Sequence, residues 1–262
     1  MKLVALAAAL GARTLNLLGM LGHAAAFFVD LMRHLTPAFR RFNLTVVQIH
    51  KIGNYSLVII VTAGAAVGGV LALQSYYSLS RYGAAESVGL LVALAMMREL
   101  GPVLSALLYA GRAGTSLTAE LGLMKAGEQL AAMEMMAVDP LGRVLAPRFV
   151  AGLISMPILG AVFSMSGVLS AYVISVKLIG LNGATFWSTM QDGVDVFEDV
   201  GNGIIKTVVF GIATTFIALY MGYESTPTPE GVAGATTRTV VASSLAVLVL
   251  DFILTALMFG PS

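Results

Sequence analysis

The sequence predicts an all-α integral membrane protein with about five membrane-spanning helices. Of its 262 residues, 58% are hydrophobic and only 11% are charged, whereas soluble domains carry about a quarter charged residues. The apolar residues form long runs, and the mean hydropathy is +0.89. Because so few charges could not cover a water-facing surface, we expect one membrane domain over residues 1–262.

Composition also excludes several classes of function. The net charge of +1 gives no general attraction to nucleic acid, and the lack of cysteine excludes disulfides, thiolate metal sites and cysteine nucleophiles. His23, His34 and His50 lack metal-ligand spacing and are expected to be interfacial, so we predict no metal site. The chain has no G-x-x-x-x-G-K-[ST] loop for nucleotide phosphates and no serine–histidine–acid pattern. We therefore expect neither an enzyme nor a bound cofactor.

A membrane span needs about 20 mostly apolar residues. Four long apolar runs meet this length, and a fifth, which carries Lys206 near its start, is slightly shorter. The predicted spans are 55–79, 84–111, 149–176, 203–223 and 240–260.

Residues 1–35 are predicted to form an amphipathic helix on the membrane surface. Arg13 interrupts the first apolar run, and Asn16, His23 and Asp30 recur every seven residues. Residues at this spacing share one helix face, and a polar stripe on an apolar helix suits an interfacial position. The competing interpretation is a signal peptide, because Lys2 precedes an alanine-rich run.

Basic residues predict the orientation, because cytoplasmic loops carry an excess of lysine and arginine. A cytoplasmic N-terminus places eleven of the fifteen inside: Lys2, Arg13, Arg33, Arg40, Arg41, Lys51, Arg112, Lys125, Arg143, Arg148 and Arg238. The outside segment between spans three and four is acidic instead, with Asp192, Asp195, Glu198 and Asp199. The C-terminus is then expected outside.

The longest polar connection, between spans two and three, is predicted to form a cytoplasmic helix over 115–138 that stops at Asp139-Pro140. Its glutamates share part of the helix circumference, and its methionines supply adaptable apolar contacts. It is either a solvated surface helix or a docking element for a cytoplasmic protein.

Charges inside the predicted spans form a second candidate site. Arg98 and Glu99 lie near the middle of span two, and Asp251 lies near the middle of span five. Such charges are costly in a bilayer and usually face a partner or a water-filled cavity. We expect these three to share one polar region, which Lys206 either joins or leaves by extending outward. That region either locks helices together or lines a cavity.

Glycine and proline mark close packing and bends within the spans. Span one has a GxxxG spacing at Gly64 and Gly68, which permits close helix approach. Gly101-Pro102 follows the charged pair after one residue. Pro157 lies within span three, where proline frees a carbonyl and bends the helix.

Two stretches resemble the MlaE family of permeases: RELGPVLSALLYAGRAGTSLTAELGLMKAGEQLAAMEMMAVDPLGRVLAPRF (98–149) and ATTRTVVASSLAVLVLDFILTALMFG (235–260). Members of this family are membrane subunits of ABC-type phospholipid transporters in the inner membrane of Gram-negative bacteria. The resemblance implies a homodimer with a cytoplasmic ABC ATPase that binds ATP and Mg, a periplasmic MCE-domain protein and a small STAS-domain protein. It also implies a role in outer-membrane lipid asymmetry.

The resemblance implies roles for particular residues. The 115–138 helix would be the coupling helix seated in the ATPase, with candidate contacts at Glu120, Met124, Glu128 and Glu134. The family's lipid pocket lies at the dimer interface and opens outward. By position, its lining would be Leu71, Leu79 and Tyr82, with Arg98 and Glu99 deeper.

Three functions are compared. The first is a permease that moves glycerophospholipid between the inner membrane and the MCE-domain partner. The second is an ion-coupled secondary transporter using Arg98, Glu99 and Asp251, against which the five spans show no internal repeat. The third is a membrane scaffold without a transport role.

Overall fold

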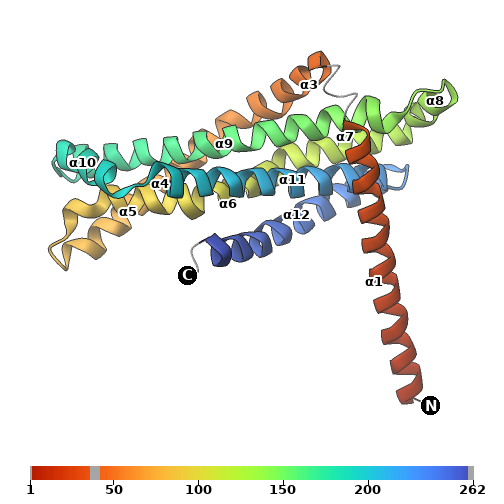
Figure 1. Ribbon diagram of the computed structural model, residues 1–262, viewed down its shortest axis with the longest axis horizontal. Helices are drawn as coiled ribbons and strands as arrows, with labels where there is room; N and C mark the ends of the chain where they lie inside the picture. The colour runs from red at the N-terminus through yellow and green to blue at the C-terminus, as the bar shows by residue number, and fades with distance from the viewer. Residues whose placement is uncertain (1, 36–41, 259–262) are drawn as a thin grey trace.

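The computed structural model describes residues 2–35 and 42–258, and for 2–14, 16 and 17 the backbone alone. Every regular element in these residues is helical (Figure 1). The helices are α1 Lys2–Arg33, α3 Phe42–Ile49, α4 Tyr55–Ser80, α5 Val88–Ala95, α6 Gly101–Tyr109, α7 Thr115–Ala126, α8 Gln129–Met135, α9 Ala146–Tyr172, α10 Gly183–Gly193, α11 Gly201–Tyr223 and α12 Pro229–Met258.

Short π-helical turns join several of these helices end to end and produce five long apolar segments. Each is long and apolar enough to cross a membrane: Phe42–Ser80, Ala85–Ala126, Leu141–Leu178, Val196–Tyr223 and Pro229–Met258. Each predicted span falls on one of them, so the all-α fold with five spans is confirmed. The predicted fifth span ends at 260, which lies outside the described residues.

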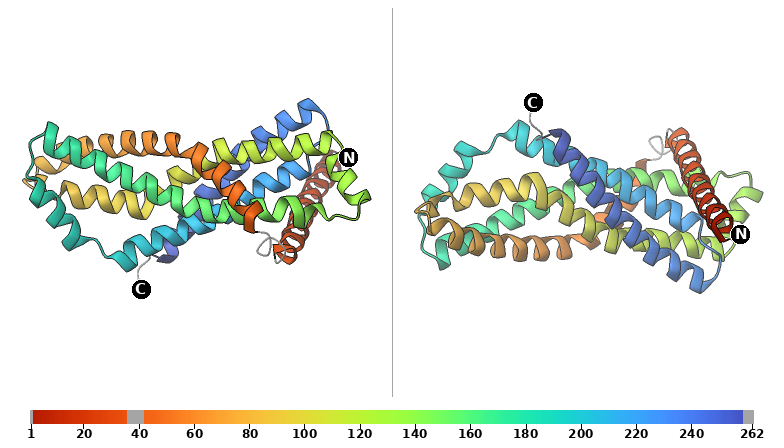
Figure 2. Two further views of the ribbon diagram at one scale, coloured as in Figure 1. Left: turned by 90° about the horizontal axis from the view of Figure 1, so that it is seen from above. Right: turned by 90° about the horizontal axis from the view of Figure 1, so that it is seen from below.

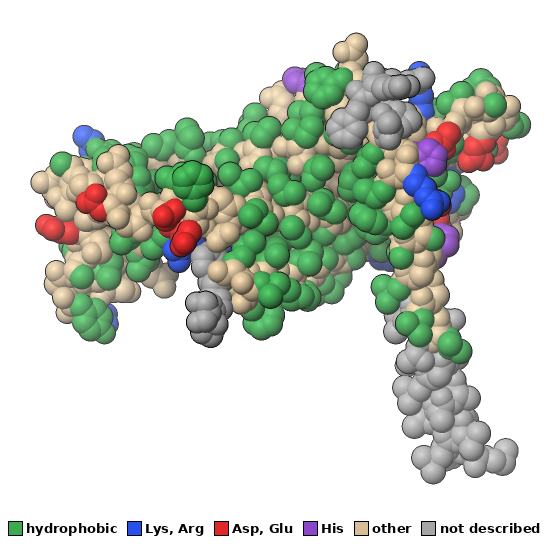
Figure 3. Space-filling model, viewed as in Figure 1, with side chains coloured by type: hydrophobic (Ala, Val, Ile, Leu, Met, Phe, Trp, Pro, Cys, Tyr) green, Lys and Arg blue, Asp and Glu red, His purple; other side chains and the backbone are tan. Residues whose placement is uncertain are grey.

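Apolar side chains cover the middle of the molecule, and charged ones gather toward its ends (Figure 3). The helices α1 and α8, predicted inside, lie at one end of the bundle, and α10, predicted outside, lies at the other (Figure 1). This arrangement suits a bundle that crosses a bilayer along its long axis.

Glycines bring spans one and three into close contact, and α4 and α9 lie side by side (Figure 2). A Cβ added to Gly68 would lie 2.1 Å from the backbone oxygen of Gly167, and one added to Gly64 would lie 2.2 Å from Ser166 Oγ. The spacing predicted to allow close approach therefore packs directly against another span.

A wide π-helical turn, Met96–Leu100, interrupts span two where the charged pair lies. Gly101 separates it from Pro102, which has no N–H to donate to the carbonyl of Arg98. The helix widens at this point rather than ending, as π-turns inside helices commonly do. Arg98 and Glu99 are therefore presented from an irregular turn within the span.

The single helix predicted over 115–138 is wrong in its extent. α7 continues span two as far as Ala126, and a turn separates it from the short α8. Gly127 ends α7, and Glu128 takes a left-handed conformation with φ 56°. A residue in the left-handed conformation just after a helix commonly marks its end. The connection is thus an extension of span two followed by a short, separate helix.

The N-terminal helix α1 runs across the end of the bundle rather than along it (Figure 1). Its last turns are anchored, because Phe27 and Leu31 are buried, and His23 Nδ1 lies 3.2 Å from the Tyr220 hydroxyl on α11. These contacts hold the C-terminal part of α1 against the end of the bundle. Of the predicted polar and basic positions, Lys2, Arg13, Asn16, Arg40 and Arg41 have side chains outside the described residues.

Candidate functional site

A buried lysine joins spans two, four and five. The Lys206 side chain is fully buried, and its Nζ lies 2.8 Å from Glu99 Oε2 and 3.0 Å from Asp251 Oδ1. The ammonium also donates to Thr255 Oγ1 at 2.7 Å, and that hydroxyl lies 3.2 Å from Glu99 Oε2. We call Glu99, Lys206, Asp251 and Thr255 the lysine cluster.

The lysine cluster places one cation against two carboxylates. Burial of an ammonium is tolerated only with close partners, because removing the charge from water costs several kcal/mol. Glu99 and Asp251 supply those partners from two different spans. The cluster therefore ties three spans together through their polar groups, as a locking pair would, in a region that is otherwise apolar.

Arg98 makes a different contact from the other predicted cluster residues. Its Nε donates to Asp199 Oδ1 at 2.5 Å, and its Nη2 contacts the same oxygen. Asp199 is almost fully buried, and its Oδ2 accepts the backbone N–H of Asp195 at 2.9 Å. The structure thus joins Glu99, Lys206 and Asp251 directly and gives Arg98 a partner at the start of span four.

Sequence reasoning placed Asp199 in the outside loop and missed this role. A usable signal was present, because Asp199 lies seven residues before Lys206 and so shares its helix face. The loop before it is well ordered by hydrogen bonds: Asp195 Oδ1 accepts the backbone N–H groups of Phe197 at 2.8 Å and Glu198 at 3.0 Å. These two bonds lower the pKa of the Asp195 carboxyl.

At the predicted inside end, the coupling candidates fall into two groups. Glu120 Oε2 lies 3.2 Å from Arg148 Nη2, which also lies 3.9 Å from Met124 Sδ, so both candidates face span three. Glu128 and Glu134 are exposed on the turn and on α8. Beside them, Met135 is 84% exposed, which gives α8 an apolar surface with acidic neighbours.

The predicted lipid-lining residues do not line one enclosed pocket. Leu71 and Leu79 both pack partly against the buried core, and Leu71 also lines an open hollow on the outer face of α4. Tyr82 lies in the turn after α4 and is 86% exposed. The outer face of α4 also holds a more polar hollow that includes Gln74 and Arg81. Leu79, Tyr82 and the polar hollow lie near the outside end of span one, and the hollow that Leu71 lines lies deeper.

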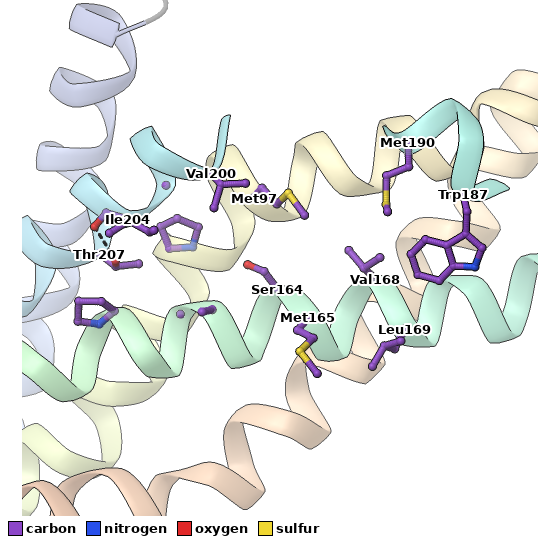
Figure 4. A pocket seen from close by; sticks show the side chains of 15 residues that line it. Met97, Ser164, Met165, Val168, Leu169, Trp187, Met190, Val200, Ile204 and Thr207 are labelled. Carbon is purple, nitrogen blue, oxygen red and sulfur yellow. Dashed lines mark hydrogen bonds between the residues drawn. The ribbon is translucent and has the colours of Figure 1, made fainter. Parts of the chain in front are cut away.

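A separate apolar cavity of about 300 Å³ lies between spans two, three and four, beneath α10 (Figure 4). Its wall includes Met97, Ser164, Val168, Trp187 and Ile204. Sequence reasoning did not find it, because its lining comes from four separate segments of the chain. The bend predicted at Pro157 was the one signal available, and Pro157 lines the cavity.

Comparisons with known proteins identify the family. The family model described as "Permease MlaE" matches residues 45–257. The chain is 50% identical to the "Intermembrane phospholipid transport system permease protein MlaE" of Haemophilus influenzae, over 96% of this chain and 97% of that one. It is 34% identical to a "Probable ABC transporter permease protein" of Rickettsia bellii, over 98% of this chain and 99% of that one.

A more distant relative comes from a plant. The "Protein TRIGALACTOSYLDIACYLGLYCEROL 1, chloroplastic" of Arabidopsis thaliana is 29% identical over 82% of this chain and 61% of its own length. The family model and the bacterial relatives each cover most of the chain. This chain belongs to the MlaE permease family.

Proposed function

We propose that the chain is the permease subunit of an ATP-driven transporter that moves glycerophospholipid between the inner membrane and a periplasmic MCE-domain partner. The observation that carries this proposal is its 50% identity, across nearly the full length of both chains, to a phospholipid transport permease. The sequence lacks a phosphate-binding loop, so ATP and Mg are bound by a partner ATPase.

A continuous helical path supports a mechanism in which ATPase motion reaches the middle of the membrane. The segment Ala85–Ala126 runs without a break from the inside end, through α7 and α6, to the turn that carries Arg98 and Glu99. A partner that displaces α8 and α7 would therefore move span two as a rod. The Glu120–Arg148 ion pair transmits part of that motion to span three.

Motion of span two would act on the polar contacts that join it to other spans within the membrane. The lysine cluster holds spans two, four and five, and the Arg98–Asp199 pair holds spans two and four. Discrete ion pairs of this kind have two arrangements, made and broken, rather than a continuum. In our proposal they set the closed arrangement of the transport path, and coupling to the ATPase shifts it.

Exposed apolar faces support assembly within a membrane. In an apolar stretch of α12 only 11% of the residues are buried. Along α4, Val58, Val70 and Tyr77 are exposed. We place the homodimer contact and the lipid path on the outer face of α4, with Leu71 and Tyr82 beside it, and leave the exposed face of α12 toward the acyl chains of the bilayer. The basic residues at the end that carries α1 and α8 favour a cytoplasmic N-terminus and a periplasmic C-terminus.

The remaining partners follow from the family. In this proposal the complex also contains an MCE-domain protein on the outside and a small STAS-domain protein on the inside. Within the complex, α8 and its exposed Met135 and Glu134 form the contact with the ATPase.

One observation favours a second function. Lys206, Glu99 and Asp251 form a cluster of ionisable groups inside the spans, which is typical of ion-coupled transporters. Such a transporter would work without an ATPase and would depend on an ion gradient. The two functions therefore separate in a single experiment.

The test is affinity purification from gently solubilised membranes, followed by mass spectrometry of proteins and lipids and then a transfer assay in proteoliposomes. We expect an ATPase, an MCE-domain protein and phospholipid to co-purify, and labelled phospholipid to move only with hydrolysable ATP. Recovery of a lone chain whose transport requires a proton gradient and not ATP would refute the proposal and favour the ion-coupled transporter.

A further inference from the structure

The cavity between spans two, three and four is almost wholly apolar and opens on the flank of the bundle. Val168 is buried in its wall, whereas Met165 and Leu169 on α9 are 66% and 46% exposed at its mouth. In a chain that spans a bilayer, such a flank faces acyl chains rather than water.

The length of the cavity matches the depth of one leaflet. Its lining on α9 extends from Pro157 to Leu169, and this separation of twelve residues corresponds to ~18 Å along a helix. Half of the hydrocarbon core of a bilayer is about 15 Å thick. The cavity thus reaches from the outside end of the bundle to near the middle of the membrane.

The two ends of the cavity differ chemically. Trp187, from α10, lies at the outside end, and Ile204 and Thr207 lie at the deep end (Figure 4). Tryptophan is enriched at membrane–water interfaces, where its ring contacts acyl chains and its N–H faces polar groups. An occupant with a polar outer end and an apolar inner end fits this gradient.

The shape of the cavity is built into the backbone. Gly203 packs so closely on span two that an added Cβ would lie 2.3 Å from the Met97 oxygen. Gly160 likewise leaves no room, because an added Cβ would lie 2.6 Å from Thr207 Cγ2. Pro157 lies inside α9 at the deep end, where it has no N–H to donate to the preceding helical turn. The floor is therefore closely packed, and the side that opens is the membrane flank.

We propose that this cavity binds one acyl chain of a phospholipid from the outer leaflet, with the headgroup beside Trp187 and the chain end near Thr207. It is separate from the outer face of α4, where the family resemblance places the lipid pocket. The inference rests on the proposed function in one respect. If the chain is a phospholipid permease, the cavity supplies a lateral route by which membrane lipid reaches or leaves it.

The test uses the complete transporter in nanodiscs that contain phosphatidylethanolamine bearing a photoreactive diazirine on one acyl chain. Two probes are compared, one with the diazirine near the chain end and one with it near the ester. After irradiation, labelled peptides are mapped by mass spectrometry. The reference for random contact with bulk lipid is Leu257 on α12, which is 78% exposed.

We expect the chain-end probe to enrich label around Pro157 and Ile204 relative to Leu257, and the ester-proximal probe to enrich it around Trp187 and Met190. Ala161→Phe places a ring at the cavity wall and should reduce this enrichment to the Leu257 level. Ile158→Phe is the matched control, because Ile158 is 53% exposed on the same helix and does not line the cavity.

Two results would overturn the inference. One is labelling no greater than that at Leu257, or enrichment that Ala161→Phe leaves unchanged. The other is a protein adduct: if benzoyl-phenylalanine in place of Ala161 captures a subunit of the transporter instead of lipid, the cavity receives a partner helix. Neither result affects the purification and ATP-dependent transfer that test the proposed function, so the two can fail separately.

Discussion

Lys206 of span four and Glu99 of span two form an ion pair of 2.8 Å, in which the lysine side chain has no exposure to solvent. Asp251 of span five lies 3.0 Å from the same ammonium. Three spans that are far apart in sequence therefore meet at one nitrogen atom. Because a buried charge is costly without its partners, this contact determines how those spans can pack.

Removing the lysine should destabilise the protein more than removing any exposed lysine. Lys206→Met leaves Glu99 and Asp251 facing each other without a cation, and breaking a buried pair costs about 3–5 kcal/mol. Because Glu99 is partly exposed, we expect the lower end, about 3 kcal/mol. The check is the unfolding free energy in detergent, with Lys177→Met at an exposed position as control. Equal losses in both variants would show that the lysine cluster does not hold the spans.

The Arg98–Asp199 pair should appear as a coupling energy rather than as a sum of single effects. We expect a double-mutant cycle of Arg98→Gln and Asp199→Asn to give a coupling energy of at least about 1 kcal/mol. Residues in contact have coupling energies of about 0.5–3 kcal/mol. The matched cycle pairs Arg98→Gln with Asp192→Asn, an exposed acid in the same outside segment, and should give a value near zero. Similar coupling in both cycles would argue for a diffuse field instead of a specific pair.

The contact between spans one and three should be sensitive to a single methyl group. Gly68→Ala would place a Cβ 2.1 Å from the Gly167 oxygen, so α4 and α9 must separate. Overpacking of this kind costs about 1–3 kcal/mol. Gly111→Ala is the control, because nothing lies within 4 Å of its added Cβ. A thermal unfolding midpoint for Gly68→Ala no lower than that of Gly111→Ala would contradict the close approach.

The two groups of coupling candidates should respond differently to substitution. Met135→Asp changes an 84% exposed side chain on α8, so we expect unchanged thermal stability and reduced recovery of the ATPase. Glu120→Gln breaks the ion pair with Arg148, so we expect lower thermal stability as well as weaker ATP-dependent transfer. Both quantities come from the same purified complexes. If Met135→Asp retained the ATPase fully, the docking surface would have to lie elsewhere than on α8.

The contribution of Asp195, in the outside segment, to stability should depend on pH. The backbone hydrogen bonds to Asp195 lower the pKa of its carboxyl in the folded state. The charged carboxylate therefore stabilises the fold at pH values above the ordinary pKa of aspartate. This stabilisation is lost as the pH falls through the folded-state pKa. We expect Asp195→Asn to reduce the unfolding midpoint near neutral pH and to match the unchanged protein once the carboxyl is protonated. A difference between the two proteins that stayed constant with pH would show that the charge is not involved.

Much of the fold could be predicted from composition and run length. A helix that crosses a bilayer needs about 20 apolar residues, and lipid offers no hydrogen-bond partners to backbone groups. The five spans can therefore be recognised from the sequence as long apolar runs. The same reasoning found Glu99, Lys206 and Asp251, because charges within apolar runs must meet a partner. It did not find the break after Ala126, since a glycine that ends one helix here resembles those that lie within spans.

The sequence by itself determined the class of protein, the number of spans and the residues that must be paired within them, because the bilayer acts on every segment locally. The tertiary structure decided which partners meet: Asp199 with Arg98, and Glu99 and Asp251 with Lys206. It also decided where a cavity remains, because four segments distant in the chain enclose it. Such pairings depend on how helices rotate and bend against one another, which no single segment specifies.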